Sequence, residues 1–427
     1  MNACFIENEV LFVMAIGLRE PLLPPRKGAK RLWAGLLLLI SAIVVFWAVP
    51  VPVFVDLDPA EALWVARLHK TLRSESALMK GSRDLQAQVE SLPSVTSLPS
   101  QWTDDDLTVS TVHFWKKFNK TYDAAAEKFR RLQIFHSQML EAEAVAGQDP
   151  GFRLGATFFG DVPKLEDDEY MGLKTNMVPP TLPLWQPPQH LQLPGAVDWR
   201  TVGCVREPKN QQKCGSCWAF ATVAALESAV CIAGLHDRHR LPNYSEQELV
   251  DCSWFLGDRG CNGGLTEWGV EYVADWGLCP EEEYEYTASD GKCRAKSCHK
   301  SHSWRVDRLQ ALPPDTQALM AALVTNGPIT VAVTAGNVPF KLYQGGILRN
   351  TATWSCEGPL DHAVTLIGFG EENGTPFWII KNSWGADWGE GGFMRMSTNS
   401  DAPYGMCNIL QEPVLVSVRM LKNSTSK

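Results

Sequence analysis

The chain has 427 residues, of which 45% are hydrophobic and 20% are charged, and its formal net charge at pH 7 is −9. This length is too great for one ordinary domain, and the composition is that of globular proteins. The negative balance gives no support for binding to nucleic acid.

The N-terminal part of the chain is predicted to anchor the protein in a membrane. Residues 1–31 form a tail that ends in a basic run, and residues 32–49 follow with Ser41 as their only polar side chain. Eighteen apolar residues are enough for one span, and basic residues before the span place the N-terminus in the cytosol. We therefore predict a type II signal anchor within residues 32–55. A cleaved signal peptide is the alternative, although its apolar region is usually shorter.

Residues 56–110 are predicted to form a stem, because the repetitive linker Ser91–Ser100 has no capacity to form a core. A helical region follows, in which Glu127, Arg131 and Phe135 recur at helical spacing. An amphipathic helical hairpin without a special function would show the same pattern. Residues 177–193 contain five prolines and are predicted to be extended.

The remainder of the chain divides into a helical part and a β-rich part. Helices are predicted over Trp218–Ala229, from the capping box Ser245-x-x-Glu248 through Cys252, and over Leu265–Trp276. Strands are predicted from residue 329 onward, at Ile329–Val333, Val364–Gly368, Phe377–Lys381, Phe393–Met396 and Val414–Val418. Two such lobes would enclose a cleft, which is a favoured position for an active site.

The segment Gln211–Phe220 contains the strongest chemical signal. Cys217 precedes the predicted helix, where unpaired backbone N–H groups and the helix dipole favour a thiolate. The alternative is that Cys214 and Cys217 form a Cys-x-x-Cys redox pair or half of a metal site. That interpretation needs a thioredoxin-like unit or a second such cysteine pair, and the sequence has neither.

The run Cys-Gly-Ser-Cys-Trp-Ala-Phe at 214–220 resembles the nucleophile segment of papain-like cysteine proteases. Leu-Asp-His-Ala-Val at 360–364 and Lys-Asn-Ser-Trp-Gly at 381–385 resemble two further segments of that family. The resemblance implies that Cys217 is the nucleophile, His362 the base and Asn382 the group that orients the imidazole. It also implies that Trp384 shields the His–Asn bond, and that Gln211 donates to the oxyanion together with the Cys217 N–H.

The resemblance further implies residues that bind substrate. Gly263 and Gly264 would allow the close backbone approach of an extended peptide. Leu265, Ala332 and Leu360 are the expected apolar walls of the pocket for the second side chain before the cut. Glu412, five residues after Cys407, would lie at the floor of this pocket. The alternative for Glu412 is a surface position on a C-terminal strand.

The chain contains twelve cysteines, and eleven of them lie between Cys204 and Cys407. Without Cys217, ten remain for five bridges, which indicates an oxidising compartment. The resemblance implies the pairs Cys214–Cys261, Cys252–Cys293 and Cys356–Cys407, and Cys279–Cys298 matches an additional bridge of some protozoan cathepsin-L-like enzymes. Cys204–Cys231 is then the remaining pair. The extra pairs could instead be free buried thiols.

Residues 111–192 resemble the inhibitory propeptide of the family, although Gln138, Ala142 and Ala146 depart from its usual helical motif. The extended stretch 177–193 would cross the active site and then be cut, and residues 193–427 would be the mature peptidase domain. The implied fold is α+β, with a helical lobe and a β-barrel-like lobe behind a helical propeptide and one transmembrane helix. The precursor would belong to the secretory, endolysosomal or vacuolar system. Its lumenal part would contain four sequons, at Asn119, Asn243, Asn373 and Asn423.

The implied activity is that of a cathepsin-L-like cysteine endopeptidase made as a zymogen and activated at acidic pH. Protonation of acidic propeptide residues is expected to weaken docking as the pH falls, and these residues are Asp161, Glu166, Asp167, Asp168 and Glu169. Its partners would be protein and peptide substrates, its own propeptide as an intramolecular inhibitor, and cystatin-like inhibitors. A monomer without metal or organic cofactor is expected. The alternatives are an inactive homologue that acts as a binding module, an exopeptidase with a blocking loop, and a transpeptidase on the same fold.

Overall fold

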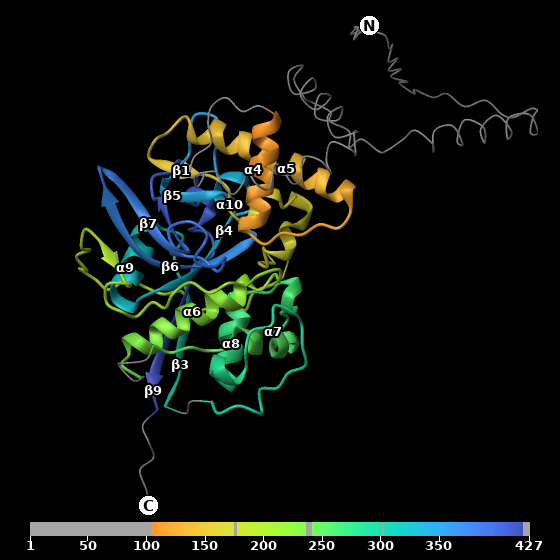
Figure 1. The fold of residues 1–427 in the computed structure, drawn as a ribbon. Helices are drawn as coiled ribbons and strands as arrows, with labels where there is room; N and C mark the ends of the chain where they lie inside the picture. The colour runs from red at the N-terminus through yellow and green to blue at the C-terminus, as the bar shows by residue number, and fades with distance from the viewer. Residues whose placement is uncertain (1–103, 175–176, 236–240, 301–302, 422–427) are drawn as a thin grey trace, which may run out of the picture. The chain divides into compact units, whose positions relative to one another are not determined.

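The computed structural model describes residues 104–174, 177–235, 241–300 and 303–421. These residues form an N-terminal segment, a helical lobe and a β-rich lobe (Figure 1). The predicted tail, signal anchor and most of the predicted stem lie outside the described residues.

The prediction of a type II membrane-anchored precursor is wrong for the part of the chain that the structure describes. No helix in these residues is both long enough and apolar enough to cross a membrane. The apolar stretch at 32–55, on which the prediction depended, is outside the described residues.

The N-terminal segment consists of short elements built around two helices. Its elements are α4 (Asp104–Lys117), α5 (Ala125–Ala146), β1 (Phe152–Leu154), η1 (Phe158–Asp161) and η2 (Lys164–Glu169). Phe135, Met139 and Ala142 occupy one face of α5 and are buried with Phe159 in a common core. Arg131, on another face, donates to Glu166 Oε1 at 2.6 Å. The predicted helix is thus present as α5, and its polar face binds η2 through the Arg131–Glu166 pair.

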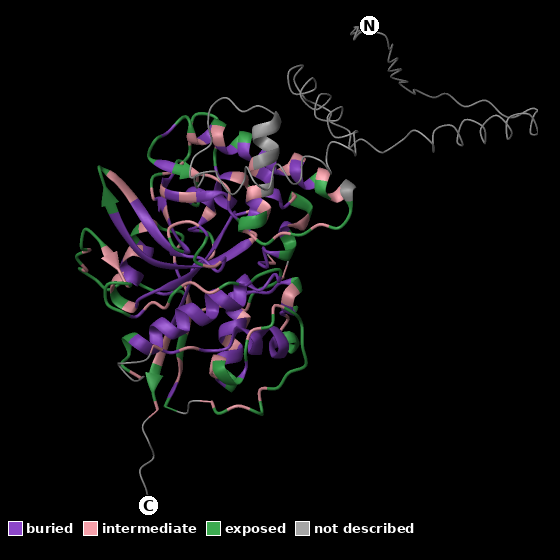
Figure 2. Ribbon diagram, viewed as in Figure 1, coloured by how far each residue is buried: buried purple, intermediate pink, exposed green. Residues whose placement is uncertain are grey.

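The helical lobe is organised around one buried helix. Its elements are α6 (Cys217–Ile232), α7 (Glu246–Cys252), η3 (Ser253–Phe255), η4 (Gly260–Asn262), α8 (Thr266–Trp276) and η5 (Glu281–Glu283). Every residue of α6 from Cys217 to Cys231 is buried (Figure 2), as expected for a helix that is apolar all round. Ser245 caps α7 by accepting from the Glu248 N–H, but the Glu248 carboxylate binds Tyr272 and the Cys279 N–H instead of completing a capping box.

The β-rich lobe contains most of a nine-stranded sheet. Its elements are β3 (Trp304–Ala311), α9 (Thr316–Asn326), β4 (Ile329–Val333), α10 (Val338–Lys341), β5 (Tyr343–Leu348), β6 (His362–Glu372), β7 (Thr375–Lys381), β8 (Phe393–Ser397), η6 (Met406–Asn408) and β9 (Val414–Met420). The strand order is β1-β5-β8-β7-β6-β4-β9-β3, and β2 (Val197–Asp198) pairs with β6. All pairs are antiparallel except β5 with β8.

The two lobes exchange their ends. Strand β2, which leads into the helical lobe, pairs with β6 at Phe369 and Gly368. Strand β9, near the C-terminus, packs against α6, and its Val416 belongs to the core of the helical lobe. Strand β2, which precedes the helical lobe in the sequence, therefore extends the sheet of the β-rich lobe. Strand β9, which ends the β-rich lobe in the sequence, completes the core of the helical lobe.

The structure contains five disulfides, in the pairs that the sequence analysis expected. They are Cys204–Cys231, Cys214–Cys261, Cys252–Cys293, Cys279–Cys298 and Cys356–Cys407. Four join parts of the helical lobe, and Cys356–Cys407 lies in the β-rich lobe. Among the described residues, Cys217 is the cysteine that remains free, and it is buried.

Candidate active site

Cys217 and His362 meet where the two lobes join. Cys217 is the first residue of α6, and His362 is the first residue of β6. The Ala363 N–H donates to Cys217 Sγ at 3.3 Å, which places the sulfur against the peptide next to His362. Helix α6 and strand β6 also pack directly against each other. The two lobes thus bring a helix N-terminus and a strand terminus, 145 residues apart in the sequence, to one point.

Asn382 and Trp384 fix the imidazole ring of His362. His362 Nε2 donates to Asn382 Oδ1 at 2.8 Å, and this oxygen also accepts from the Ser383 N–H at 2.8 Å. The Trp384 ring stacks on the imidazole with centroids 4.6 Å apart. His362 Nδ1 has no hydrogen-bond partner among the described residues, so the ring presents an open nitrogen. The imidazole is therefore held in one tautomer and one orientation.

Burial sets the ionisation of both groups in this structure. It raises the pKa of the Cys217 thiol to about 11, against the opposing effect of backbone N–H groups that donate to the sulfur. It lowers the pKa of His362 to about 4, against the opposing effect of the hydrogen bond to Asn382. The sequence analysis expected the helix terminus to favour a thiolate, but desolvation is the larger effect here. At neutral pH the pair is an uncharged thiol beside an uncharged imidazole.

The side-chain amide of Gln211 lies near the start of α6 and is already engaged. Gln211 Nε2 donates to the carbonyl oxygens of Tyr170 at 2.8 Å and Cys214 at 2.9 Å. Gln211 Oε1 accepts from Ser383 Oγ at 2.6 Å. The Gln211 amide, which the resemblance assigns as a donor to the oxyanion, thus donates to the Tyr170 carbonyl of the N-terminal segment.

Residues 170–174 of the N-terminal segment lie across the nucleophile. The Gly172 N–H donates to Cys217 Sγ at 3.1 Å, and the Gly172 carbonyl accepts from the Gly264 N–H at 2.9 Å. A Cβ at Gly172 would lie only 1.8 Å from the Gly215 carbonyl oxygen, so only glycine permits this approach. The sequence analysis expected the proline-rich stretch 177–193 to cross the site. The residues that cross the site are instead 170–174, upstream of that stretch. They include Gly172, the glycine that this close approach requires.

The three expected apolar walls come together around a residue of the N-terminal segment. Leu173 is buried in one cluster with Leu265, Ala332 and Leu360, and the cluster includes Cys217. The Leu173 N–H also donates to the Asp361 carbonyl at 3.1 Å. A pocket next to the nucleophile is thus formed and is filled by a leucine side chain.

Glu412 lies on the approach to β9 and is half-buried. Burial raises its pKa, and its charge is close enough to Glu267 to raise the pKa of that carboxyl in addition to the larger effect of burial. Glu267 follows the pocket residue Leu265 by two positions, at the start of α8. Glu412 therefore lies near the start of α8, which begins one residue after Leu265.

The metal-site alternative from the sequence concerned Cys214 and Cys217, but Cys214 is bonded to Cys261 and so does not pair with Cys217. Among the described residues, Glu248, Cys279 and Cys298 form one group with ligand atoms close enough to surround an ion. The two sulfurs are joined in a disulfide, however, and the carboxylate is paired with Lys300. The atoms of this group that could bind a metal ion are therefore already bonded or paired within the protein.

Several residues at the site were not identified from the sequence. Ser383 holds the Gln211 amide, and Tyr170, Gly172 and Leu173 occupy the positions next to the nucleophile. Gly172 stands between apolar residues near the end of an acidic run, and a glycine there is a signal for close backbone approach. Ser383 gave no separate signal, because it lies in the 381–385 motif, which was singled out for Asn382.

Comparisons with known proteins agree with this geometry. The family described as papain family cysteine protease matches residues 193–417. A senescence-specific cysteine protease, SAG39, of Oryza sativa subsp. japonica is 35% identical over 327 residues, which cover 74% of this chain and 92% of that protein. Procathepsin L of Mus musculus is 34% identical over 315 residues, which cover 71% of this chain and 91% of that protein.

The fold is likewise similar to solved precursor structures. Digestive procathepsin L 3 from the larval midgut of Tenebrio molitor superposes with a TM-score of 0.62 at 29% identity. The superposition covers 73% of this chain and 99% of that chain, so it extends over the N-terminal segment as well as the two lobes.

Proposed function

The chain belongs to the papain family of cysteine proteases, and from this premise we propose a latent endopeptidase that acts through Cys217, His362 and Asn382. We propose residues 111–192 as its inhibitory propeptide and residues 193–427 as its mature domain. The observation that carries the proposal is the pair of contacts from the N-terminal segment, Gly172 N–H on Cys217 Sγ and the Tyr170 carbonyl on Gln211 Nε2. These contacts fill the positions that a scissile peptide would need.

In the proposed mechanism, the Cys217 thiolate attacks the carbonyl carbon of the peptide bond. Gln211 Nε2 and the Cys217 N–H stabilise the oxyanion that forms. The imidazolium of His362 gives its proton to the leaving amine, the C–N bond breaks, and an acyl-enzyme remains. His362 then takes a proton from water, the hydroxide attacks the thioester, the C–S bond breaks, and the acid product leaves with the thiolate and imidazolium restored. Asn382 keeps the ring in place throughout.

The propeptide maintains latency by two effects in this proposal. It covers the nucleophile, and its burial of Cys217 and His362 favours their uncharged forms through raised and lowered pKa values respectively. Its departure admits water, so the helix dipole can then stabilise the thiolate beside an imidazolium. Acid-treated protein should hydrolyse peptide amides and lose this hydrolysis when a thiol-trapping epoxide alkylates Cys217. An absence of label on Cys217 in hydrolytically active protein would refute the assignment.

The sign of the pH dependence favours one contact as the site at which acid weakens docking of the propeptide. The sequence suggested the acidic run that includes Asp167, but burial raises the pKa of Asp167 despite the ion pair with Lys341. A raised pKa in the docked state means that protonation of Asp167 favours docking as the pH falls. Asp149 has the required sign, because hydrogen bonds from Arg349 lower the pKa of its carboxyl below 3.8. The stability it contributes is present above pH 3.8 and is lost below it.

Replacement of Asp149 by asparagine should raise self-processing of the full-length chain at neutral pH. Arg349 of the β-rich lobe would lose its charged partner in the N-terminal segment, where Asp149 Oδ1 accepts from Arg349 Nη2 at 2.6 Å. After allowance for solvent around the partly exposed guanidinium, the pair contributes about 1 kcal/mol, or roughly a fivefold change in the undocked fraction. The rate of processing is measured from pH 3 to pH 7, and its dependence on pH should become shallower. Asp168→Asn is the matched control, since that side chain is 86% exposed. Equal changes in both variants would contradict the role of Asp149.

Replacement of Glu412 by alanine should selectively impair the cleavage of substrates that place an arginine side chain in the pocket that Leu173 fills here. In the proposed role, a substrate guanidinium pairs with Glu412, while a substrate leucine rests on Leu265, Ala332 and Leu360 as Leu173 does here. The expected loss of kcat/KM for arginine is about 1–3 kcal/mol, or five- to a hundredfold, with little change for leucine. Two peptides that differ only at this position are compared on processed enzyme. Equal losses for both peptides would remove Glu412 from the pocket.

A further inference from the structure

The loop that follows η5 brings one tyrosine hydroxyl into contact with two segments of the active site. The Tyr286 hydroxyl donates to the Gln211 carbonyl at 2.8 Å, and its oxygen lies 2.7 Å from Ser216 Oγ. A phenol has one hydrogen, which here goes to the carbonyl, so the Ser216 hydroxyl donates to the Tyr286 oxygen. Gln211 carries one proposed oxyanion donor, and Ser216 directly precedes the other, the Cys217 N–H. One oxygen atom therefore joins the two residues on which the oxyanion donors depend.

The Gln211 carbonyl belongs to a turn with an unusual backbone conformation. Gln212 has a φ of 54°, in the left-handed region that residues other than glycine seldom occupy. The Gln212 N–H donates to Asn210 Oδ1 at 2.8 Å, and the Gln211 N–H donates to the Ser383 carbonyl at 2.8 Å. The Gln211 carbonyl in turn accepts from Tyr286. The phenol thus fixes the third backbone group of a turn whose conformation is not favoured by its own residues.

The side-chain amide on this turn has one N–H to offer to a reacting group. Gln211 Oε1 accepts from Ser383 Oγ at 2.6 Å, and Gln211 Nε2 donates to the Cys214 carbonyl at 2.9 Å. The same nitrogen donates to the Tyr170 carbonyl at 2.8 Å. An amide nitrogen has two hydrogens, so departure of the propeptide would free the one that Tyr170 now accepts. The direction of this N–H depends on the Gln211 backbone, and hence on Tyr286.

Ser216 connects the same phenol to the second oxyanion donor. Ser216 is buried at the start of α6, and its hydroxyl bonds Tyr286 instead of an N–H in the first turn of the helix. The Cys214 carbonyl is a more distant partner of this hydroxyl, at 3.5 Å. The Ser216 carbonyl accepts from the Ala219 N–H at 2.9 Å. Both the side chain and the carbonyl of Ser216 are therefore held, and with them the peptide that ends in the Cys217 N–H.

Tyr286 is itself fixed by residues of the helical lobe. Its N–H donates to Glu281 Oε1 at 3.0 Å, and the N–H of Thr287 donates to Gln247 Oε1 at 2.8 Å. Its ring meets the Phe220 ring of α6 edge to face, with centroids 4.9 Å apart. Burial raises the pKa of the Tyr286 phenol, so the hydroxyl keeps its hydrogen at neutral and acidic pH. The donor is therefore in place before any substrate arrives, and it costs no reorganisation during the reaction.

We propose that Tyr286 is a positioning residue for the oxyanion site, and that its hydroxyl aligns Gln211 and the Ser216–Cys217 peptide. This role rests on the proposed function, in which Gln211 Nε2 and the Cys217 N–H stabilise the oxyanion. Tyr286 acts through the two residues that it binds and not on the reacting atoms. Because the oxyanion forms only after attack, misaligned donors should lower kcat and leave KM nearly unchanged.

The test replaces Tyr286 by phenylalanine, which keeps the ring on Phe220 and removes the oxygen. The enzyme is processed, and its concentration is set by titration of Cys217 with the epoxide, so that only folded molecules are counted. For a peptide amide, kcat should fall about tenfold and KM should stay within twofold of wild type. The rate of alkylation by the epoxide should match wild type, because that reaction forms no oxyanion at these donors.

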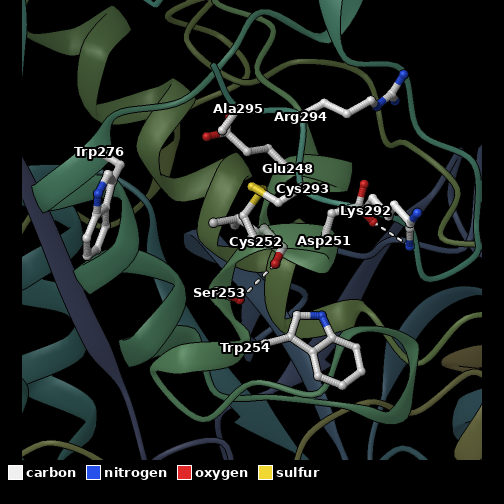
Figure 3. The surroundings of a disulfide bond; sticks show 12 residues. Glu248, Asp251, Cys252, Ser253, Trp254, Trp276, Lys292, Cys293, Arg294 and Ala295 are labelled. Carbon is white, nitrogen blue, oxygen red and sulfur yellow. Dashed lines mark hydrogen bonds between the residues drawn. A yellow bond between two sulfur atoms is a disulfide. The ribbon is translucent and has the colours of Figure 1, made fainter. Parts of the chain in front are cut away.

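Tyr284→Phe is the matched control, since it removes a phenol oxygen from the same loop. The Tyr284 hydroxyl donates to Asp251 Oδ2 at 2.7 Å, and Asp251 lies next to the Cys252–Cys293 disulfide (Figure 3). This variant should keep the wild-type kcat, even if removal of the hydrogen bond lowers its melting temperature. A fall in kcat that is confined to Tyr286→Phe therefore reports on the oxyanion site and not on the stability of the loop.

A double-variant cycle shows whether Tyr286 acts through Gln211. Gln211→Ala should lower kcat about 100-fold, and Tyr286→Phe in that background should lower it only about threefold further, through Ser216. An unchanged kcat in Tyr286→Phe, an equal fall in Tyr284→Phe, an equal fall in the rate of alkylation, or a full tenfold loss in the Gln211→Ala background would overturn the positioning role.

Failure of the proposed function would give a different result. Processed wild-type protein would then neither hydrolyse the peptide amide nor be labelled at Cys217, or Gln211→Ala would retain the wild-type kcat. Either result would remove the oxyanion site and the role of Tyr286 with it. A large loss in Gln211→Ala together with no loss in Tyr286→Phe would instead leave the proposed function intact and refute only the role of Tyr286.

Discussion

Replacement of Cys217 by serine is expected to abolish peptide hydrolysis and to preserve the fold. The sulfur is buried and accepts from two backbone N–H groups, of Gly172 and Ala363, and a hydroxyl oxygen can accept from the same groups. A serine hydroxyl beside this imidazole remains protonated, so it is a far weaker nucleophile than a thiolate. The expected loss of kcat is about 10⁴-fold or more.

The measurement uses protein processed in trans, because the serine variant should not process itself. A trace of wild-type enzyme removes the propeptide, is inactivated with the epoxide, and hydrolysis of a peptide amide is then followed. Cys4→Ser is the control for loss of a thiol as such and should hydrolyse the peptide at the wild-type rate. Turnover retained in the Cys217→Ser variant would refute the mechanism.

Replacement of Gly172 by alanine is expected to release the propeptide from the active site. The added Cβ would lie 1.8 Å from the Gly215 carbonyl oxygen, and this backbone atom has little freedom to move. The segment must therefore lift, and the hydrogen bonds to Cys217 and Gly264 are lost with it. Overpacking and two lost hydrogen bonds together weaken docking by about 3 kcal/mol, or roughly 100-fold.

The readout is the rate at which the epoxide labels Cys217 in the intact chain at neutral pH. Gly195→Ala is the matched control, because a Cβ at that position meets no atom within 4 Å. Both variants should yield processed enzyme with wild-type kcat/KM, which shows that the catalytic domain has folded. Unchanged labelling of Gly172→Ala would mean that this segment does not block the nucleophile.

Short motifs beside recognisable elements indicated residues that the structure brings together. Cys217, His362 and Asn382 each lie in such a motif, and the structure brings their side chains and Gln211 to the junction of the lobes. The helix predicted over Leu265–Trp276 from its apolar spacing is α8 (Thr266–Trp276), and the apolar run predicted as a helix over Trp218–Ala229 is α6 (Cys217–Ile232). Strands β3 and β5 were not predicted, since β3 has polar Arg305, Asp307 and Arg308 along its length and β5 contains two glycines.

Ionisation and long-range pairing could not be read from the sequence. The helix terminus at Cys217 suggested a thiolate, but burial under residues far upstream reverses that preference. Asp149 and Arg349 are separated by 200 residues, so no local pattern indicates their contact. Asp167 stands in a conspicuous acidic run and yet responds to pH with the opposite sign, because its burial was not visible. Desolvation is a property of the folded chain and not of its composition.

The exchange of ends between the lobes has a consequence for synthesis of the protein on the ribosome. The core of the helical lobe includes Val416 and Trp304, and β3 needs β9 as its partner over seven residue pairs. The helical residues 217–276 thus emerge well before the strands that complete their core. The helical lobe must therefore wait until translation is nearly finished before it becomes stable, while the N-terminal segment is available from the start. Contacts of such long sequence separation also slow folding, so the nascent catalytic domain is expected to need protection by chaperones until release.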